Sequence, residues 1–226
     1  LIFMHNVVER LMAIQSEIKE LLIKNNLQNK DLNIIIICKT FSMDKILPLI
    51  DAGHVHFGEN KVQEAELKWK EVKKKHSNIK LHMVGKLQTN KVKTALNIFD
   101  YIHSVDNYKL AEKIVKYEKE LNKKIKTFVQ VNVGEESQKN GISPKNVGQF
   151  ANYCRDSLSL NVIGLMCLPP INDNPEKYFL SLNQLKNQTD LRHLSMGMSD
   201  DYQTAIKCGS TFLRIGSKIL GERNTS

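Results

Sequence analysis

The sequence predicts an α/β protein, a single parallel (β/α)8 barrel of the TIM type with an extra helix at its N-terminus. Two observations lead there. Short β-rich runs alternate strictly with amphipathic helical patterns, which favours a parallel sheet with helical crossovers. Eight such runs fit into 226 residues, which suits a small closed barrel better than an open doubly wound sheet. Turn signals do not separate the closed from the open form, so the open sheet stays as the alternative. No linker divides the chain, and we expect one domain over residues 1–226.

The elements follow in order along the chain. A helix over residues 1–27, packing on the barrel, comes first, with Phe3, Val7, Leu11, Ile14, Ile18 and Leu21 along one stripe. Strands are predicted at 34–38, 55–57, 80–84, 101–105, 127–133, 162–166, 192–195 and 212–215. Helices are predicted at 43–52, 62–75, 89–97, 108–121, 144–157, 176–188 and 200–207, with a short last turn after 217. The helical spacing is clear in one segment, where Leu110, Ile114, Tyr117 and Leu121 fall on one face.

Composition limits the class of protein. Hydrophobic residues make up 41% of the chain, enough for a folded core. No run of 18 apolar residues occurs, so no membrane partner is expected. The cysteines, Cys38, Cys154, Cys167 and Cys208, are scattered, which argues against a zinc ribbon or disulfide framework and suits a reducing compartment. We expect a cytoplasmic protein. A mitochondrial location stays open because the sequence begins with Leu1, so that a targeting segment could precede it.

The net charge of +9 permits a nucleic-acid partner or an anionic small ligand. Lysines gather in helical stretches, as at Lys68, Lys70, Lys73, Lys74 and Lys75. No aromatic residues for base stacking are interleaved there. These runs are interpreted as solvated helix faces, and nucleic-acid binding is the lesser alternative.

Chemistry in a parallel barrel collects at the carboxyl ends of the strands. Lys39 ends a run of four isoleucines and a cysteine, and a lysine in a partly apolar pocket is a competent amine for a Schiff base. Ser199 precedes one helical segment, and Gly216 with Ser217 opens the last turn. Two neighbouring openings with hydroxyl and N–H groups would suit one phosphate. An aldehyde that carries a phosphate, such as pyridoxal 5'-phosphate, would supply a carbonyl for Lys39 and a phosphate for the two helix openings.

Several motifs in the same order then resemble one family. These are "CKTFS", "GHVHFGENKVQEAELKW", "VGKLQTNKVK", "IHSVDNYKLAEK", "QVNVGEESQKNGIS", "GLMCLPP" and "LSMGMSDDYQTAIKCGSTFLRIGSKILGER". Together they resemble the pyridoxal phosphate homeostasis protein family, whose fold is like the N-terminal barrel of alanine racemase. The match runs from about residue 38 to residue 223.

The resemblance implies roles for particular residues. Lys39 would form the Schiff base with pyridoxal 5'-phosphate. Arg214 would lie beside the pyridine nitrogen. The remaining cofactor-binding residues it implies are Asn60, Met196, Ser199, Gly216 and Ser217, with Met198 also beside the ring. Two residues depart from the family: Ser217 stands where members commonly carry Thr, and Lys86 adds a cation near the expected mouth. Neither change removes a needed group.

Simpler interpretations exist for several residues. Glu59 and Asn60 would also cap the helix that starts near Val62. Asp200 and Asp201 are good first-turn acids for any helix. Met196 and Met198 fit as core filler, and Cys38 as a small buried residue. His54 and His56 are expected on one strand face, but no third ligand is spaced for a metal, so both are interpreted as structural.

The function implied is a non-catalytic protein that binds pyridoxal 5'-phosphate and stores, buffers or delivers it inside the cell. An arginine beside the ring nitrogen disfavours its protonation and weakens the ring as an electron sink. A racemase also needs a second acid–base group, which Lys39 alone does not supply. No catalytic residue and no metal site are therefore predicted. A pyridoxal-phosphate-dependent racemase of low activity is the first alternative. Amino acids and apo-enzymes that use the cofactor are candidate partners of a protein expected to be a monomer.

Overall fold

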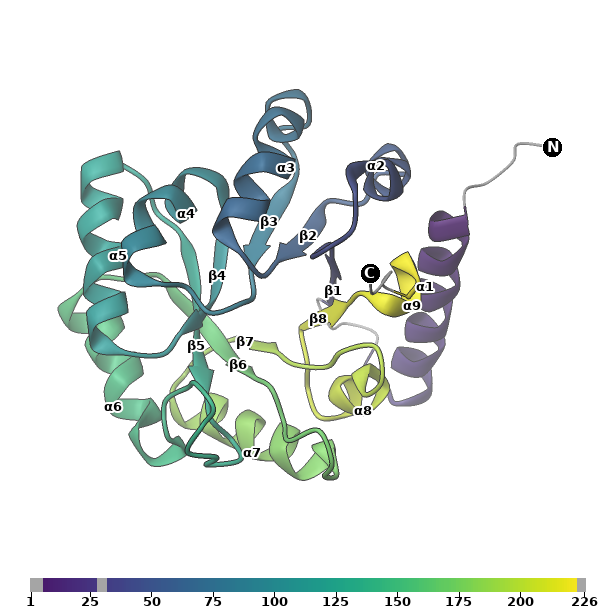
Figure 1. Cartoon of the computed structure of the whole chain (residues 1–226). Helices are drawn as coiled ribbons and strands as arrows, with labels where there is room; N and C mark the ends of the chain where they lie inside the picture. Colours follow the sequence, from purple (N-terminus) through teal and green to yellow (C-terminus); the bar gives the residue numbers. More distant parts are fainter. Residues whose placement is uncertain (1–5, 28–31, 223–226) are drawn as a thin grey trace.

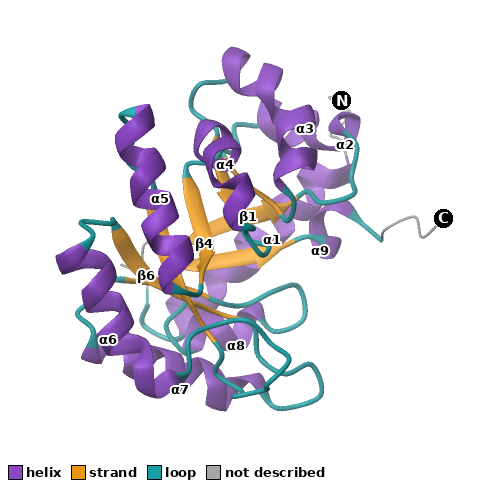
Figure 2. Cartoon of the chain, turned by 60° about the vertical axis from the view of Figure 1, so that its left-hand side comes forward, coloured by secondary structure: helices purple, strands orange, loops and turns teal. Residues whose placement is uncertain are grey.

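The computed structural model describes residues 6–27 and 32–222 and shows a closed barrel of parallel strands in the order β1 to β8 (Figures 1 and 2). Hydrogen bonds between β8 and β1 close the ring, with Ile35 opposite Arg214 and Ile36 opposite Ile215. The strands are β1 Asn33–Ile37, β2 His56–Glu59, β3 Lys80–Met83, β4 Tyr101–Val105, β5 Lys126–Val131, β6 Val162–Cys167, β7 His193–Ser195 and β8 Phe212–Ile215. The predicted barrel is thus confirmed over the open sheet.

Helices cover the outside of the barrel (Figure 2). They are α1 Asn6–Lys24, α2 Met43–Asp51, α3 Val62–Lys75, α4 Val92–Ile98, α5 Tyr108–Leu121, α6 Val147–Asn152, α7 Pro175–Gln188, α8 Tyr202–Lys207 and α9 Ser217–Leu220. The last of these is a single turn, too short to cover β8 and β1. The first helix, α1, packs against α9, α2 and α8 and fills that place (Figure 1). Among the stripe residues predicted for it, Val7, Leu11, Ile14 and Ile18 are buried, while Phe3 lies outside the described residues.

Three predicted elements differ clearly from the structure. The helix expected at 89–97 begins as a 3-10 turn, Thr89–Lys91, and continues as α4. The strand expected at 127–133 ends at Val131, because the chain folds back: Ile142 N donates to Gln130 O, and Asn132 N donates to Ile142 O. The helix expected at 144–157 divides into a 3-10 turn, Pro144–Asn146, then α6, then a π-helical turn, Tyr153–Ser157.

The side chains of each strand point alternately outward and inward, so the barrel has two separate hydrophobic cores. Between strands and helices lies the larger cluster, which includes Ile34, Ile36, Leu213 and Ile215. Inside the barrel lies a smaller cluster of Ile35, Ile37, Tyr101, Phe128, Met166 and Phe212. Because side chains two residues apart share one face of a strand, Arg214 points into the barrel as Phe212 does. A cation is thereby placed in the interior.

Three further features bear on function. In the described part of the chain, no helix is long and apolar enough to cross a membrane. No cluster of His, Cys, Asp or Glu in that part could hold a metal ion. All four cysteines are buried and unbonded to one another.

Candidate functional site

Lys39 lies in the short loop that leaves β1, and its neighbours hold this loop in an unusual conformation. Thr40 has a left-handed backbone with φ 67°, which is costly for a residue with a branched side chain. Its amide donates to Glu64 Oε1 (2.7 Å), and its hydroxyl donates to the carbonyl of Lys39 (2.5 Å). Cys38 N donates to Gly58 O (2.8 Å). The half-buried Lys39 is therefore fixed from both sides along the chain.

A buried ion cluster supports this loop from α3. Lys68 Nζ donates to the carbonyl of Cys38 (2.8 Å) and forms ion pairs with Glu59 (2.8 Å) and Glu64 (3.0 Å). Trp69 Nε1 donates to the same Glu59 oxygen (2.9 Å). Burial raises the pKa of Glu59, against the lowering effect of Lys68 and Trp69. The cluster ties the end of β2 and the start of α3 to the backbone beside Lys39.

This cluster corrects two expectations. Neither Glu59 nor Asn60 caps α3, since the N-cap is Lys61 and no side chain bonds there. Lys68 does not belong to a solvated face, since its side chain is only 14% exposed. The sequence held one signal for it: Glu64 and Lys68 are four residues apart, the spacing of helix ion pairs.

Two hydroxyls meet at the carboxyl ends of β7 and β8. Ser217 Oγ donates to Ser199 Oγ over 3.1 Å, although the two residues are 18 positions apart. Asp201 Oδ1 accepts from Met198 N (2.6 Å) and so shapes the turn that carries Ser199. Gly197 in this turn has φ 93°, and a Cβ there would lie 2.6 Å from the Cβ of Ala205. Only glycine therefore fits at this point, where the turn returns over the barrel edge.

The acids of that turn do not serve as first-turn acids of α8. The helix begins at Tyr202, its N-cap is Asp201 without a side-chain cap bond, and no acid lies in its first turn. Asp200 is exposed. The expectation that Asp200 and Asp201 lie in the first turn of α8 is therefore wrong, and Asp201 instead accepts a hydrogen bond within the turn before the helix.

Arg214 is a buried cation without a carboxylate partner. Its residue is 4% exposed, its Nη1 donates to Ser195 Oγ (2.7 Å), and its Nη2 donates to the carbonyl of Cys167 (2.8 Å). Among the ion pairs of residues 6–27 and 32–222 it takes no part. Burial lowers its pKa, partly offset by the fields of Cys167 and Asp201. A buried guanidinium held only by neutral oxygens is well suited to face an acceptor or anionic ligand.

The remaining predicted residues are placed as follows. Gly216 packs against Ile37 of β1, where a Cβ would lie 3.4 Å from the Ile37 carbonyl. Asn60 follows β2 and lines a pocket that Lys86 shares. Lys86 Nζ donates to Asn140 Oδ1 (2.7 Å).

Met196 is fully buried in the cluster between strands and helices. Its side chain therefore lies on the opposite side of β7 from Ser195, and its expected contact with a ligand stays a prediction. Met198 is 39% exposed at the mouth.

Behind Arg214 runs a chain of polar side chains that the sequence analysis missed. Ser195 Oγ lies 2.9 Å from His103 Nδ1, His103 Nε2 lies 2.9 Å from His82 Nδ1, and His82 Nε2 lies 3.0 Å from His56 Nδ1. Ser195, His82 and His103 are fully buried. Burial, first of all, holds the pKa of His82 and His103 well below the ordinary value, so both rings are neutral.

His54 and His56 do not share a face. His54 lies before β2, in a pocket lined by Gln15 and Ile18 of α1, and its Nε2 bonds the carbonyl of His56 (2.9 Å). His56 is the first residue of β2 and belongs to the chain inside the barrel. The expectation of one shared face is wrong because the strand starts two residues later than the first histidine.

The comparisons with known proteins agree with this architecture. The family described as "Alanine racemase, N-terminal domain" matches residues 17–224. The "Pyridoxal phosphate homeostasis protein" of Aquifex aeolicus (strain VF5) is 37% identical over 194 residues, covering 82% of this chain and 84% of the relative. The protein of the same name from Haemophilus influenzae is 31% identical and covers 98% of each chain.

Solved structures give the same result. The structure of PipY from Synechococcus elongatus PCC7942 with PLP bound has a TM-score of 0.82 and 29% identity, covering 95% of this chain and 100% of that chain. Alanine racemase from Clostridium difficile 630 has a TM-score of 0.68 at 13% identity, which shows a shared barrel alone. The chain therefore belongs to the pyridoxal phosphate homeostasis protein family, within the alanine racemase N-terminal domain family.

Proposed function

We propose that this protein binds pyridoxal 5'-phosphate reversibly at the carboxyl mouth of its barrel and serves the cell by holding and releasing the cofactor. The observation that carries the proposal is Arg214, a buried cation that forms no ion pair among the described residues, beside a pair of hydroxyls and one strand away from Lys39. These groups match the parts of the cofactor, which has an aldehyde, a phosphate and a ring nitrogen. The names of the relatives and the PLP-bound PipY structure support the same assignment.

Each residue then has a separate task. Lys39 is the amine that holds the aldehyde. Ser199 and Ser217 donate to the phosphate together with the backbone at Gly216, where the absence of a side chain lets the phosphate approach. Asn60 lines the same mouth from β2. Met196 is assigned to the packing behind the site.

Arg214 acts on the ring rather than on the phosphate. Ser195 and the Cys167 carbonyl hold its guanidinium inside the barrel, on the opposite side of β8 from the outward Ile215. A cation there opposes protonation of the ring nitrogen. When bound, the cofactor supplies an electron sink for amino-acid chemistry, and Arg214 keeps that sink weak. This favours a carrier over a catalyst.

The tyrosines support a binder in a second way. A racemase needs an acid–base group on the face opposite the lysine. Tyr101 lies at the opposite end of the barrel, as the first residue of β4. Tyr202 donates to Glu17 of α1, and its pKa is raised to about 12, mainly by burial. Tyr108 packs edge-on against Phe150. Tyr101 and Tyr202 are therefore held away from the mouth.

The test is a spectroscopic titration with borohydride trapping. Pyridoxal 5'-phosphate added to the protein should give the yellow absorbance of a lysine adduct, and reduction followed by peptide mass analysis should locate the label on Lys39. Lys39→Ala should lose both signals and keep its fold by circular dichroism. Lys86→Ala is the matched control, since Lys86 is another lysine at this mouth, in the pocket that Asn60 lines. A label that remains in Lys39→Ala and disappears in Lys86→Ala would overturn the assignment.

Turnover separates carrier from enzyme. The loaded protein should leave the configuration of L-alanine unchanged over hours, as measured by chiral chromatography. Multiple turnovers that depend on Lys39 would instead establish the racemase alternative.

A further inference from the structure

A second pocket opens at the amino end of the barrel, away from the site described above. It has a volume of about 710 Å³, and its lining includes the first residue of each of the strands β1 to β8: Asn33, His56, Lys80, Tyr101, Lys126, Val162, His193 and Phe212. Barrel enzymes place their chemistry at the other end. This pocket is large enough for a small organic ligand, and the proposed function gives it no role.

The pocket is strongly basic. Its lining includes Lys80, Lys126, Arg155 and Arg192, and its one carboxylate is Asp190. Lys80 and Arg192 are exposed, and neither has an ion-pair partner among the residues that the structure describes. Several cations with one carboxylate between them repel one another, and an anion among them would relieve that repulsion.

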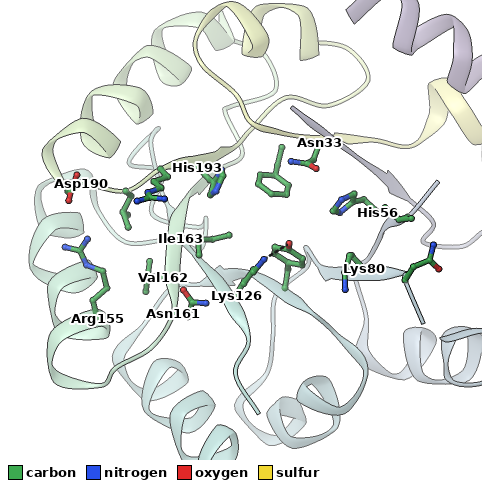
Figure 3. Close-up of a pocket in the computed structure, with 16 residues that line it drawn as sticks. Asn33, His56, Lys80, Lys126, Arg155, Asn161, Val162, Ile163, Asp190 and His193 are labelled. Atoms are coloured by element: carbon green, nitrogen blue, oxygen red, sulfur yellow. Dashed lines mark hydrogen bonds between the residues drawn. The ribbon is translucent and has the colours of Figure 1, made fainter. Parts of the chain in front are cut away.

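The floor of the pocket is aromatic. Phe212 and Tyr101 have ring centroids 6.0 Å apart, and His82 stacks on Tyr101 at 4.2 Å. Lys126 reaches toward this floor (Figure 3). Its Nζ lies 5.2 Å from the centroid of the Tyr101 ring and 3.3 Å from the Tyr101 hydroxyl. A ligand that fits would carry a negative group for the lysines and a flat ring for the floor.

The histidine chain connects this pocket to Arg214. Which atom donates and which accepts in each of its hydrogen bonds follows from the arginine. Arginine has only donors, so Ser195 Oγ accepts, and the serine hydroxyl hydrogen goes to His103 Nδ1. The neutral His103 then carries its hydrogen on Nε2 and donates to His82 Nδ1, and His82 donates in the same way to His56 Nδ1. His56 then carries its hydrogen on Nε2, and His56 lines the pocket.

The reverse arrangement, in which His103 donates to Ser195, is excluded by the serine hydroxyl. Ser195 Oγ would accept twice, and its hydrogen would have no acceptor among the described residues. Hydrogen bonds in a chain polarise one another. An acceptor at the His56 end would therefore strengthen every bond as far as Arg214, and a change at Arg214 would alter the donor strength of His56.

We propose that the pocket at the amino end of the barrel binds a small organic anion, a carboxylate or phosphate attached to a flat ring, and that the histidine chain couples its occupancy to the Arg214 end. The binding claim stands on the pocket alone. The coupling claim rests on the proposed function, because it needs a cofactor beside Arg214.

Binding is tested with phenyl phosphate as the probe and protein labelled with 15N in its histidine rings. Titration should shift the His56 and His193 signals to saturation, and benzyl alcohol, the uncharged counterpart, should bind at least tenfold more weakly. Lys80→Gln with Lys126→Gln should weaken phenyl phosphate at least tenfold. The matched control is Lys116→Gln with Lys119→Gln on α5, which removes the same charge elsewhere and should bind like the wild type.

The variant Ser217→Ala distinguishes phenyl phosphate bound in this pocket from phenyl phosphate bound at the carboxyl mouth of the barrel. This variant should leave the His56 shift unchanged. Equal affinity in Lys80→Gln with Lys126→Gln, equal binding of benzyl alcohol, or the absence of saturation would each overturn the pocket assignment.

Coupling is tested by comparing the apoprotein with protein whose cofactor has been fixed by borohydride reduction, since phenyl phosphate cannot then compete for the cofactor site. The affinity of the pocket should differ at least threefold between the two forms. Ser195→Ala, which disconnects Arg214 from His103, should abolish the difference and keep the pocket. An unchanged affinity in the wild type would overturn the coupling alone. Failure of the reduction to label the protein would count against the proposed function instead.

Discussion

Acidification should unfold this protein well above the pH at which its carboxylates titrate, because neutral histidines are buried in the native state. Burial, first of all, lowers the pKa of His54 from 6.5 to about 4, and it holds the pKa of His82 and His103 well below 6.5. The unfolded chain binds a proton at each of these rings as the pH falls through 6.5, and the folded chain does not. Each ring therefore contributes stability that is present at neutral pH and is lost on acidification.

The size of the loss follows from the difference in bound protons. At pH 5 an unfolded histidine is almost fully protonated, so each ring that stays neutral in the folded protein lowers the free energy of unfolding by about 2 kcal/mol relative to pH 7, and the three together by about 6 kcal/mol. Near pH 5.5 the slope should approach roughly 3.5 kcal/mol per pH unit. Glu59 and Asp201, whose pKa values are raised by burial, take up protons in the folded state and reduce the loss at the acidic end.

Urea unfolding, followed by circular dichroism across this pH range, measures the slope. His54→Gln keeps a side-chain donor for the His56 carbonyl and should reduce the slope by about one third. A free energy of unfolding that stays constant between about pH 6.5 and about pH 5 would show that the rings are protonated or solvated in the folded protein, and the histidine chain would then not exist as described.

Three other predictions concern single groups. Ser199→Ala and Ser217→Ala should each weaken pyridoxal 5'-phosphate by about 1–2 kcal/mol, while pyridoxal without phosphate should bind poorly to the wild type; equal affinity for both compounds in a fluorescence titration contradicts the phosphate role. Arg214→Glu should keep the Lys39 adduct but raise the pKa of the ring nitrogen and change the absorbance spectrum; loss of all binding in a folded variant would make Arg214 a phosphate ligand. Gly164→Ala would place a Cβ 2.2 Å from a backbone carbonyl of β7 and should cost at least about 2 kcal/mol in urea unfolding, whereas Gly148→Ala, with open space around it, should cost nothing.

Most of the fold was predictable because strand–helix alternation is a local signal that each segment carries alone. The strands predicted at 101–105 and 212–215 and the helices at 62–75 and 108–121 have the observed bounds. The split of the helix at 144–157 was not predictable, because its last turn changes hydrogen-bond register without a proline or glycine to mark the change.

The site divides in the same way. The rule that strand ends meet at one mouth predicted that Lys39 and the two serines lie at the same end of the barrel, and Ser199 does lie beside Ser217 there. This rule could not find the buried polar groups behind the site. Their hydrogen-bond partners are set by closure of the barrel and not by spacing along the sequence. His82, His103 and Ser195 are separated from their partners by 26, 21 and 92 residues. Glu59 was misassigned because a helix cap is the commoner role for a polar residue before a helix, and its buried partner Lys68 lay in a run of lysines.

The seam between β1 and β8 also sets when this site can exist during synthesis. It joins residues 33–36 to residues 212–215, so the ring cannot close on the ribosome before nearly all of the barrel has been made. In the proposed site, Lys39 emerges first, and Arg214 and Ser217 emerge only with β8, the last strand of the barrel, and the turn after it. The proposed pocket for a reactive aldehyde is therefore complete only when β8 docks. Closure of the barrel and completion of the proposed cofactor site would thus occur in the same step.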